Sequence, residues 1–131
     1  KDEKEFLSNN NSRAMLNFGH TIGHAIESHY NYEKFNHGEA ISIGMITEAK
    51  ISNYLGLLSS KELEKIIIHF KKCKLKIYDK ILKDRILIKI LAKDKKNFQN
   101  NINFSLIKQI GSSIFYKKLD KYQVYKILKN I

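Results

Sequence analysis

The chain has 131 residues, 43% of them hydrophobic, which suits one compact core and no more than one typical domain. Its net charge is +11, but nearly all basic residues are lysines spread along the chain, so an anionic small-molecule substrate fits the charge as well as a nucleic acid does. There is no apolar run of about 18 residues, no leader with a cleavage site and one cysteine, Cys73, so we expect a cytoplasmic protein without membrane spans or internal disulfides.

The first part of the chain has a helical pattern. A first helix is predicted from Arg13 to about Tyr30, after the polar capping residues 9–12. Residues 31–37 break the helical period and are predicted as a loop. A second helix is expected over about 38–55, where Gly56 would serve as the C-cap.

The rest of the chain continues with helices and adds a strand pair. A third helix is predicted after Ser59 and Ser60, ending near residue 74, and a short one over roughly 80–92. Apolar residues then alternate, which predicts a small β-hairpin near residues 101–117. Asp120 is expected to open a last helix. The sequence therefore predicts a mainly α fold with a small β-hairpin.

A stripe of polar residues runs along the predicted first helix. Steps of 4, 3, 4 and 3 residues place its five members on one line of a 3.6-residue helix: Arg13, Asn17, His20, His24 and Glu27. A solvated face is the ordinary interpretation, but exposed faces elsewhere in this chain consist of Lys and Glu. Gly19 and Gly23 each cost about 1 kcal/mol of helix stability relative to Ala, which indicates that something approaches the backbone closely. We therefore favour an enclosed polar site.

Histidines in this region suggest a metal site. His20 and His24 are four residues apart, so both could bind one metal from a helix face. No Glu follows the first of them, so the base of a zincin-type protease is missing. His37 stands at the entrance to the second helix, where a loop could turn its ring toward the first helix. The spacing alone leaves open which of these histidines are ligands.

Two long motifs resemble the 3-dehydroquinate synthase family. They are RAMLNFGHTIGHAIE at residues 13–27 and HGEAISIGM at residues 37–45, and the similarity continues through residues 94–96 and 102–111. The resemblance implies that residues 1–131 are the helical, metal- and substrate-binding C-terminal domain of that fold. This domain would be incomplete on its N-terminal side, and the NAD-binding domain would be absent from the chain.

The resemblance also implies an activity. The family converts 3-deoxy-D-arabino-heptulosonate 7-phosphate into 3-dehydroquinate and phosphate in the shikimate pathway to aromatic amino acids, using NAD and a divalent Zn or Co ion. The implied partner is thus an anionic sugar-acid phosphate, and no nucleic acid or membrane is expected to bind. The full-length protein is expected to form a homodimer. The chain by itself is expected to be inactive.

By motif, the resemblance assigns roles to individual residues. His20 and His37 correspond to metal ligands, and the third ligand, a Glu, would lie upstream of residue 1. Substrate binding and catalysis would involve Asn17, His24 and Lys95, with Lys95 at the phosphate, and Arg13 would face the substrate carboxylate. Without the resemblance, residues 94–96 would be read as a solvated turn. An insertion of about five residues over 6–12 departs from the family pattern.

Two alternatives remain beside this hypothesis. One is an NAD- and metal-dependent polyol dehydrogenase of the same fold, which substrate turnover by the completed enzyme would distinguish. The other, held as remote, is a basic helical module for nucleic acid. It predicts salt-sensitive binding that survives the loss of both His20 and His37.

Overall fold

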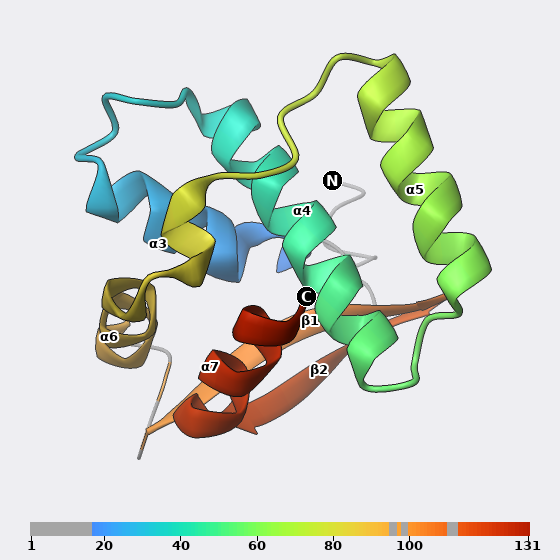
Figure 1. The fold of residues 1–131 in the computed structure, drawn as a ribbon. Coiled ribbons are helices and arrows are strands. Elements are labelled where there is room, and N and C mark those ends of the chain that lie inside the picture. The colour runs from blue at the N-terminus through green and yellow to red at the C-terminus, as the bar shows by residue number, and fades with distance from the viewer. Residues whose placement is uncertain (1–16, 95–96, 98–99, 110–112) are drawn as a thin grey trace, which may run out of the picture.

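The structure is a computed structural model that describes residues 17–94, 97, 100–109 and 113–131. Four features predicted above lie outside these residues: the capping residues 9–12, the insertion at 6–12, Arg13 and Lys95. The described chain is mainly helical with one antiparallel strand pair, so the predicted fold class is confirmed (Figure 1). Its elements are α3 (His20–His29), α4 (His37–Tyr54), α5 (Ser60–Lys72), the 3₁₀ helix η1 (Lys80–Lys83), α6 (Arg85–Lys93), β1 (Asn101–Gln109), β2 (Ser113–Asp120) and α7 (Lys121–Asn130).

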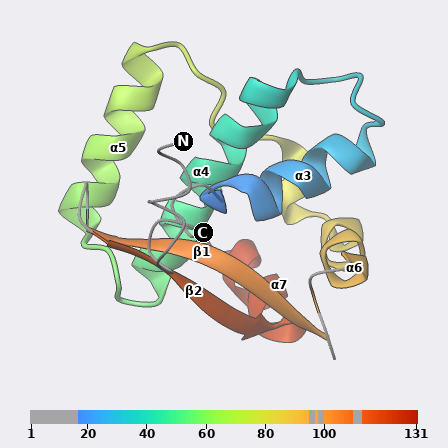
Figure 2. The ribbon, with the colours of Figure 1, turned by 180° about the vertical axis from the view of Figure 1, so that it is seen from behind.

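Helix α4 is the centre of the fold. Its apolar residues occur on almost every side, as expected for a helix surrounded by protein, and eleven of its 18 residues are buried. Figure 1 shows α3 crossing α4 on one side, α5 on the other and the hairpin beneath it. Seen from behind in Figure 2, the hairpin lies in front of α7. Helix α4 thus contacts α3, α5, α7 and β1.

The hairpin closes the main core. Strand β1 pairs with β2 in a register that places Ile102 opposite Leu119, with a shift between Ile107 and Gln109. Alternate residues Ile102, Phe104 and Leu106 are fully buried in the main hydrophobic cluster, which they share with α3, α4, α6 and α7. The predicted hairpin is confirmed and extends to residue 120.

Local capping residues set most helix boundaries where the sequence placed them. The Ser59 side chain accepts a hydrogen bond from the Glu62 N–H at the start of α5, and Asp120 does the same for α7. Gly56 follows α4 with φ +81, as a C-terminal glycine should. Helix α4 starts one residue earlier than predicted, because Asn36 forms a capping box with Glu39.

Two predicted helices are wrong in their extent. Helix α3 starts only at His20, because Gly19 has φ +86 and lies in the left-handed region, so Asn17 is outside this helix. The polar stripe is therefore not a feature of one continuous helix. The predicted helix at 80–92 is divided into η1 and α6, since Asp84 adopts an extended conformation and caps the second piece through the Ile86 N–H.

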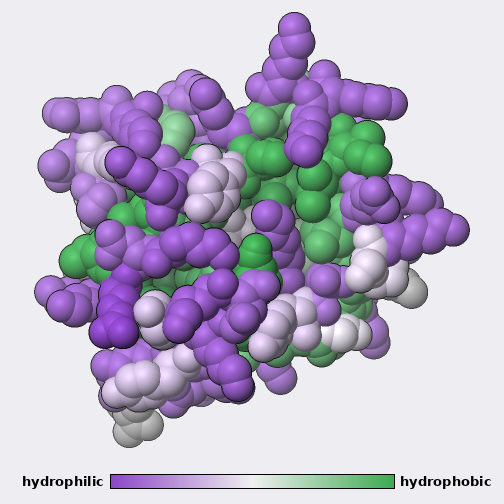
Figure 3. Space-filling model, viewed as in Figure 1, coloured by the Kyte–Doolittle hydropathy of each residue, from purple (hydrophilic) through white to green (hydrophobic). Residues whose placement is uncertain are grey.

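Helix α5 is the least buried of the described helices. None of its side chains is fully buried, and its half-buried Leu63 and Ile66 contact a small second cluster formed by Ala49, Leu58 and Ile107. Figure 3 shows hydrophobic atoms gathered on the side of the molecule where α5 and α4 lie, within a mostly hydrophilic surface. No helix in the described part of the chain combines the length and apolarity that a membrane crossing requires.

Candidate functional site

Three histidines from two helices meet beside the α3–α4 contact. The ring centroids of His20 and His24 are 5.1 Å apart, those of His20 and His37 are 5.8 Å apart, and those of His24 and His37 are 6.1 Å apart. Two imidazoles on one tetrahedral metal, with metal–nitrogen bonds of about 2.0–2.1 Å, hold their centroids roughly 5 Å apart. The tertiary structure thus brings His37 to the pair on α3. Distance alone still does not select two ligands among the three rings.

Hydrogen bonds to Nδ1 orient the rings of His20 and His37. Nδ1 of His37 is 2.8 Å from a carboxylate oxygen of Glu27, and Nδ1 of His20 is 3.3 Å from the carbonyl oxygen of Phe18. Both oxygens can only accept a hydrogen bond, so Nδ1 must be the donor in each ring. A neutral imidazole whose Nδ1 carries the hydrogen has its lone pair on Nε2. In its neutral form each of these two rings therefore presents Nε2 as the metal-binding nitrogen, on the side away from its anchor.

The start of α3 is held by a carboxylate from α4. Glu48 is completely buried, and its two oxygens accept hydrogen bonds from the N–H groups of Gly19, at 2.8 Å, and Ile22, at 3.0 Å. A capping box normally satisfies these two donors with side chains of the helix itself. Here α3 has no side-chain cap of its own, and Glu48 supplies both acceptors from another helix. This carboxylate fixes the first turn, from which His20 projects.

Glycines let α3 and α4 approach backbone to backbone. A Cβ added at Gly44 would overlap the carbonyl oxygen of Gly19, and one added at Gly23 would lie 3.1 Å from the carbonyl oxygen of Ala40. The prediction that something approaches the Gly19 and Gly23 backbone closely is confirmed. The neighbour that comes close is helix α4 and not a ligand. These glycines are therefore evidence of helix packing and not of a binding site.

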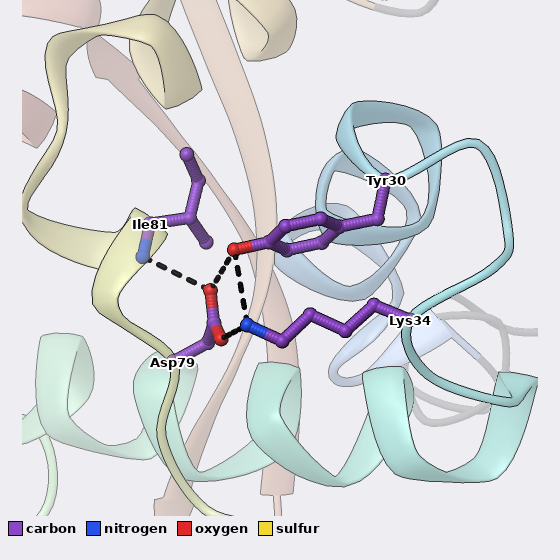
Figure 4. A network of polar contacts seen from close by, with 4 residues as sticks. All are labelled: Tyr30, Lys34, Asp79 and Ile81. Atoms are coloured by element: carbon purple, nitrogen blue, oxygen red, sulfur yellow. Dashed lines mark hydrogen bonds and ion pairs between the residues drawn. The ribbon is translucent and has the colours of Figure 1, made fainter.

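The loop between α3 and α4 is tied to the rest of the chain by a polar network (Figure 4). Asp79, with a side chain only 5% exposed, accepts hydrogen bonds from the Tyr30 hydroxyl at 2.5 Å, from Lys34 Nζ at 2.7 Å and from the Ile81 N–H at 3.0 Å. Burial alone would raise the pKa of the Asp79 carboxyl, but these donors outweigh it and hold that pKa below its usual value. The network restrains the loop that leads to His37.

Asp79→Asn should destabilise the protein by about 1–3 kcal/mol at pH 7, since it removes the charge that all three donors share. A lowered folded-state pKa means that the contribution is present above the unfolded value of 3.8 and disappears as the pH falls through the lower folded value. The unfolding free energies of wild type and Asp79→Asn should therefore differ most above about pH 5 and converge in acid. Urea titrations between pH 2.5 and 7 measure this difference. Tyr30→Phe, which keeps the carboxylate, should retain most of the pH dependence; parallel curves for wild type and Asp79→Asn would contradict the assignment.

His24 lines a hollow between α3 and α6. The hollow has a volume of about 270 Å³ and is also lined by Ser28, Lys93 and Asp94. It therefore places His24 beside Asp94. Asn17 is exposed and precedes the break at Gly19. The sequence-predicted residues Arg13 and Lys95 belong to the part of the chain that the structure does not describe.

Sequence reasoning gave no role to two acidic residues at this site. The spacing puts Glu27 on the polar stripe without a partner, and Glu48 belongs to no motif in the sequence. A lone carboxylate inside the apolar run of α4 was the available signal, because a buried charge requires partners. Among the described residues, no set of three His, Cys, Asp or Glu side chains is arranged to hold a metal ion.

Comparisons with known proteins bear on this site. Residues 1–97 match a family model described as 3-dehydroquinate synthase C-terminal. The chain is 41% identical over 128 residues to the 3-dehydroquinate synthase of Clostridium acetobutylicum and 41% identical over 129 residues to that of Helicobacter pylori. In each case the alignment covers 98% of this chain but only 35% and 36% of the relative. The chain thus spans about a third of the length of these relatives.

Solved structures show the same fold. The 2-epi-5-epi-valiolone synthase of Streptomyces hygroscopicus subsp. jinggangensis, bound to NAD⁺ and Zn²⁺, is 21% identical, with a TM-score of 0.73 over 88% of this chain and 32% of that chain. A 2-deoxy-scyllo-inosose synthase complexed with carbaglucose-6-phosphate, NAD⁺ and Co²⁺ is 24% identical, with a TM-score of 0.66 over 87% of this chain and 34% of that chain.

Proposed function

The chain belongs to the 3-dehydroquinate synthase family, and we propose that it is the metal- and substrate-binding part of a 3-dehydroquinate synthase. The proposed reaction converts 3-deoxy-D-arabino-heptulosonate 7-phosphate into 3-dehydroquinate and phosphate. The proposed cofactors are NAD and a divalent Zn or Co ion, the ions that the two solved neighbours bind. We assign NAD to a part of the enzyme other than this chain, since the sequence contains no glycine-rich dinucleotide fingerprint.

One observation carries the proposal: His20 and His37 both have Nδ1 held by an oxygen acceptor while their rings lie 5.8 Å apart. This arrangement suits a divalent ion, because neutral imidazoles with a fixed second nitrogen are its usual ligands. His20 and His37 are thus the two proposed ligands from this chain. A divalent ion bound there would polarise a substrate hydroxyl.

The other residues are proposed to handle the substrate. His24 lines the hollow together with Lys93 and Asp94, where an anionic substrate group can lie near Lys93. A histidine in this place can bind a substrate oxygen or exchange a proton with it. Arg13, Asn17 and Lys95 remain proposed substrate ligands on the motif alone. The +11 charge of the chain favours a phosphorylated, carboxylated substrate.

A chimera tests the function. This chain would replace the matching C-terminal part of the Clostridium acetobutylicum 3-dehydroquinate synthase, to which it is 41% identical. We expect phosphate release from the heptulosonate substrate and stoichiometric bound metal. His20→Ala and His37→Ala should each remove metal and activity together, because either substitution leaves this chain with a single ligand for the ion. Metal content by atomic absorption and phosphate release are the measurements.

The control for this series is His69→Ala, which changes an exposed histidine on α5 and should leave both readouts at the wild-type level. A folded His20→Ala or His37→Ala chimera that keeps stoichiometric metal would refute the ligand assignment. A folded, metal-bound chimera that oxidises glycerol with NAD and leaves the heptulosonate untouched would favour the polyol dehydrogenase alternative.

A further inference from the structure

Glu27 carries a buried carboxylate. It lies in α3 seven residues after His20, and its side chain is 5% exposed. In the described part of the chain its carboxylate makes one hydrogen bond, from Nδ1 of His37 at 2.8 Å. A buried charge is unfavourable unless a partner compensates for it. The interaction with His37 therefore has to account for the burial of this charge.

The His37 ring is in the opposite situation, because its side chain is 61% exposed. An exposed imidazole can rotate about its side-chain bonds and can carry its hydrogen on either nitrogen. A carboxylate that accepts from Nδ1 fixes the orientation of the ring and the position of the hydrogen at once. Nε2 is then left with its lone pair.

From this geometry we infer that Glu27 is a positioning residue, which holds His37 in the tautomer and orientation that present Nε2 to the divalent ion. This inference rests on the proposed function, in which His37 is a ligand. A charged acceptor also increases the electron density of the ring, which strengthens the nitrogen as a ligand. Among the described residues the anchor of the His20 ring is the Phe18 carbonyl, at 3.3 Å, so Glu27 acts on His37.

Other contacts maintain the local fold without Glu27. The start of α4 is held by the capping box of Asn36 and Glu39, and the preceding loop is tied down by Asp79. The loss of the Glu27 carboxylate therefore changes the ring of His37 while leaving the helix that carries it in place. This separates a positioning role from a merely structural one.

The first test is the tautomer of each histidine in the full, metal-free 131-residue chain. Nitrogen-15 spectra of the imidazoles at pH 8, where histidines are ordinarily neutral, report which nitrogen carries the hydrogen. We expect Nδ1–H for His37 in the wild type and a shift toward Nε2–H in Glu27→Ala, with His20 unchanged in the same sample. Glu27→Gln keeps a neutral acceptor and should shift His37 less. A His37 spectrum that is the same in wild type and Glu27→Ala, or an equal change at His20 and His37, overturns the inference.

The second test is the affinity for Co²⁺, followed by its visible absorption in the chimera with the Clostridium acetobutylicum enzyme, because the third proposed ligand lies upstream of residue 1. Glu27→Ala should weaken binding by about 10–100-fold, as the loss of an outer-shell partner does at other metal–histidine sites. Glu33→Gln is the matched control, because it removes an exposed carboxylate from the adjacent loop and should change the affinity by less than about twofold. Equal Co²⁺ affinity in wild type and Glu27→Ala also overturns the inference. Failure of the chimera without substitutions to bind Co²⁺ counts against the proposed metal site, and the tautomer test still decides the role of Glu27.

Discussion

Gly44→Ala should destabilise the protein by roughly 3 kcal/mol, although alanine is the better helix former by about 1 kcal/mol. The added methyl group would overlap the carbonyl oxygen of Gly19 and lie 2.8 Å from the nitrogen of Gly23. Both neighbours are backbone atoms, which cannot rotate away as a side chain can. The two helices must therefore move apart, and His20 must move away from His37. Urea denaturation measures the stability, and Co²⁺ affinity should fall with it.

The matched control is Gly38→Ala in the first turn of the same helix. A Cβ at Gly38 would meet only the Asn36 side-chain oxygen, at 3.5 Å, which is an ordinary contact. The protein should therefore be as stable as wild type or up to about 1 kcal/mol more stable. A Gly44→Ala protein at least as stable as Gly38→Ala would show that α3 and α4 do not pack as closely as described.

Glu48→Ala is the second substitution with a large expected effect. It leaves the N–H groups of Gly19 and Ile22 without their acceptors in a buried place, and it opens a cavity in the core beside α4. Hydrogen bonds to a charged group contribute about 1.5–3 kcal/mol each, so for two bonds we expect a total loss of roughly 3–6 kcal/mol. The first turn of α3 should fray, which hydrogen exchange at the Ile22 amide would detect as lost protection.

Two further variants serve as comparisons for Glu48→Ala. Glu48→Gln keeps the shape and one acceptor oxygen but presents an NH₂ group to the second N–H donor, so it should lose about half as much stability as Glu48→Ala. Glu64→Gln removes an exposed carboxylate on α5 and should stay within about 0.5 kcal/mol of wild type. If Glu48→Ala were as stable as Glu64→Gln, the carboxylate could not be the cap of α3.

Local patterns predicted the elements well. Ser59 and Asp120 marked two helix starts, and the alternation of Ile102, Phe104 and Leu106 marked the hairpin, because each signal acts within a few residues. The resemblance named the right family, and the histidines that it singled out do meet in space. Their roles as ligands stay predictions.

Long-range contacts account for what the sequence did not predict. A continuous first helix was expected because Gly19 fits the helical period, yet its left-handed φ follows from the close approach of α4 and from Glu48, 29 residues away. The glycines looked like signs of a ligand because periodicity cannot show which neighbour comes close. The signal that divides the 80–92 segment is local, because Asp84 is a capping residue. The strong apolar pattern on both sides of Asp84 concealed this signal.

The sequence by itself determined the mainly helical fold, the hairpin and the presence of His20, His24 and His37 at spacings that allow a shared site, because these depend on residue type and short-range geometry. Only the tertiary structure decided that Glu27 and not a backbone group anchors His37. It also decided that Glu48 caps α3 from another helix, since such hydrogen bonds join segments that the folding of α3 onto α4 brings together.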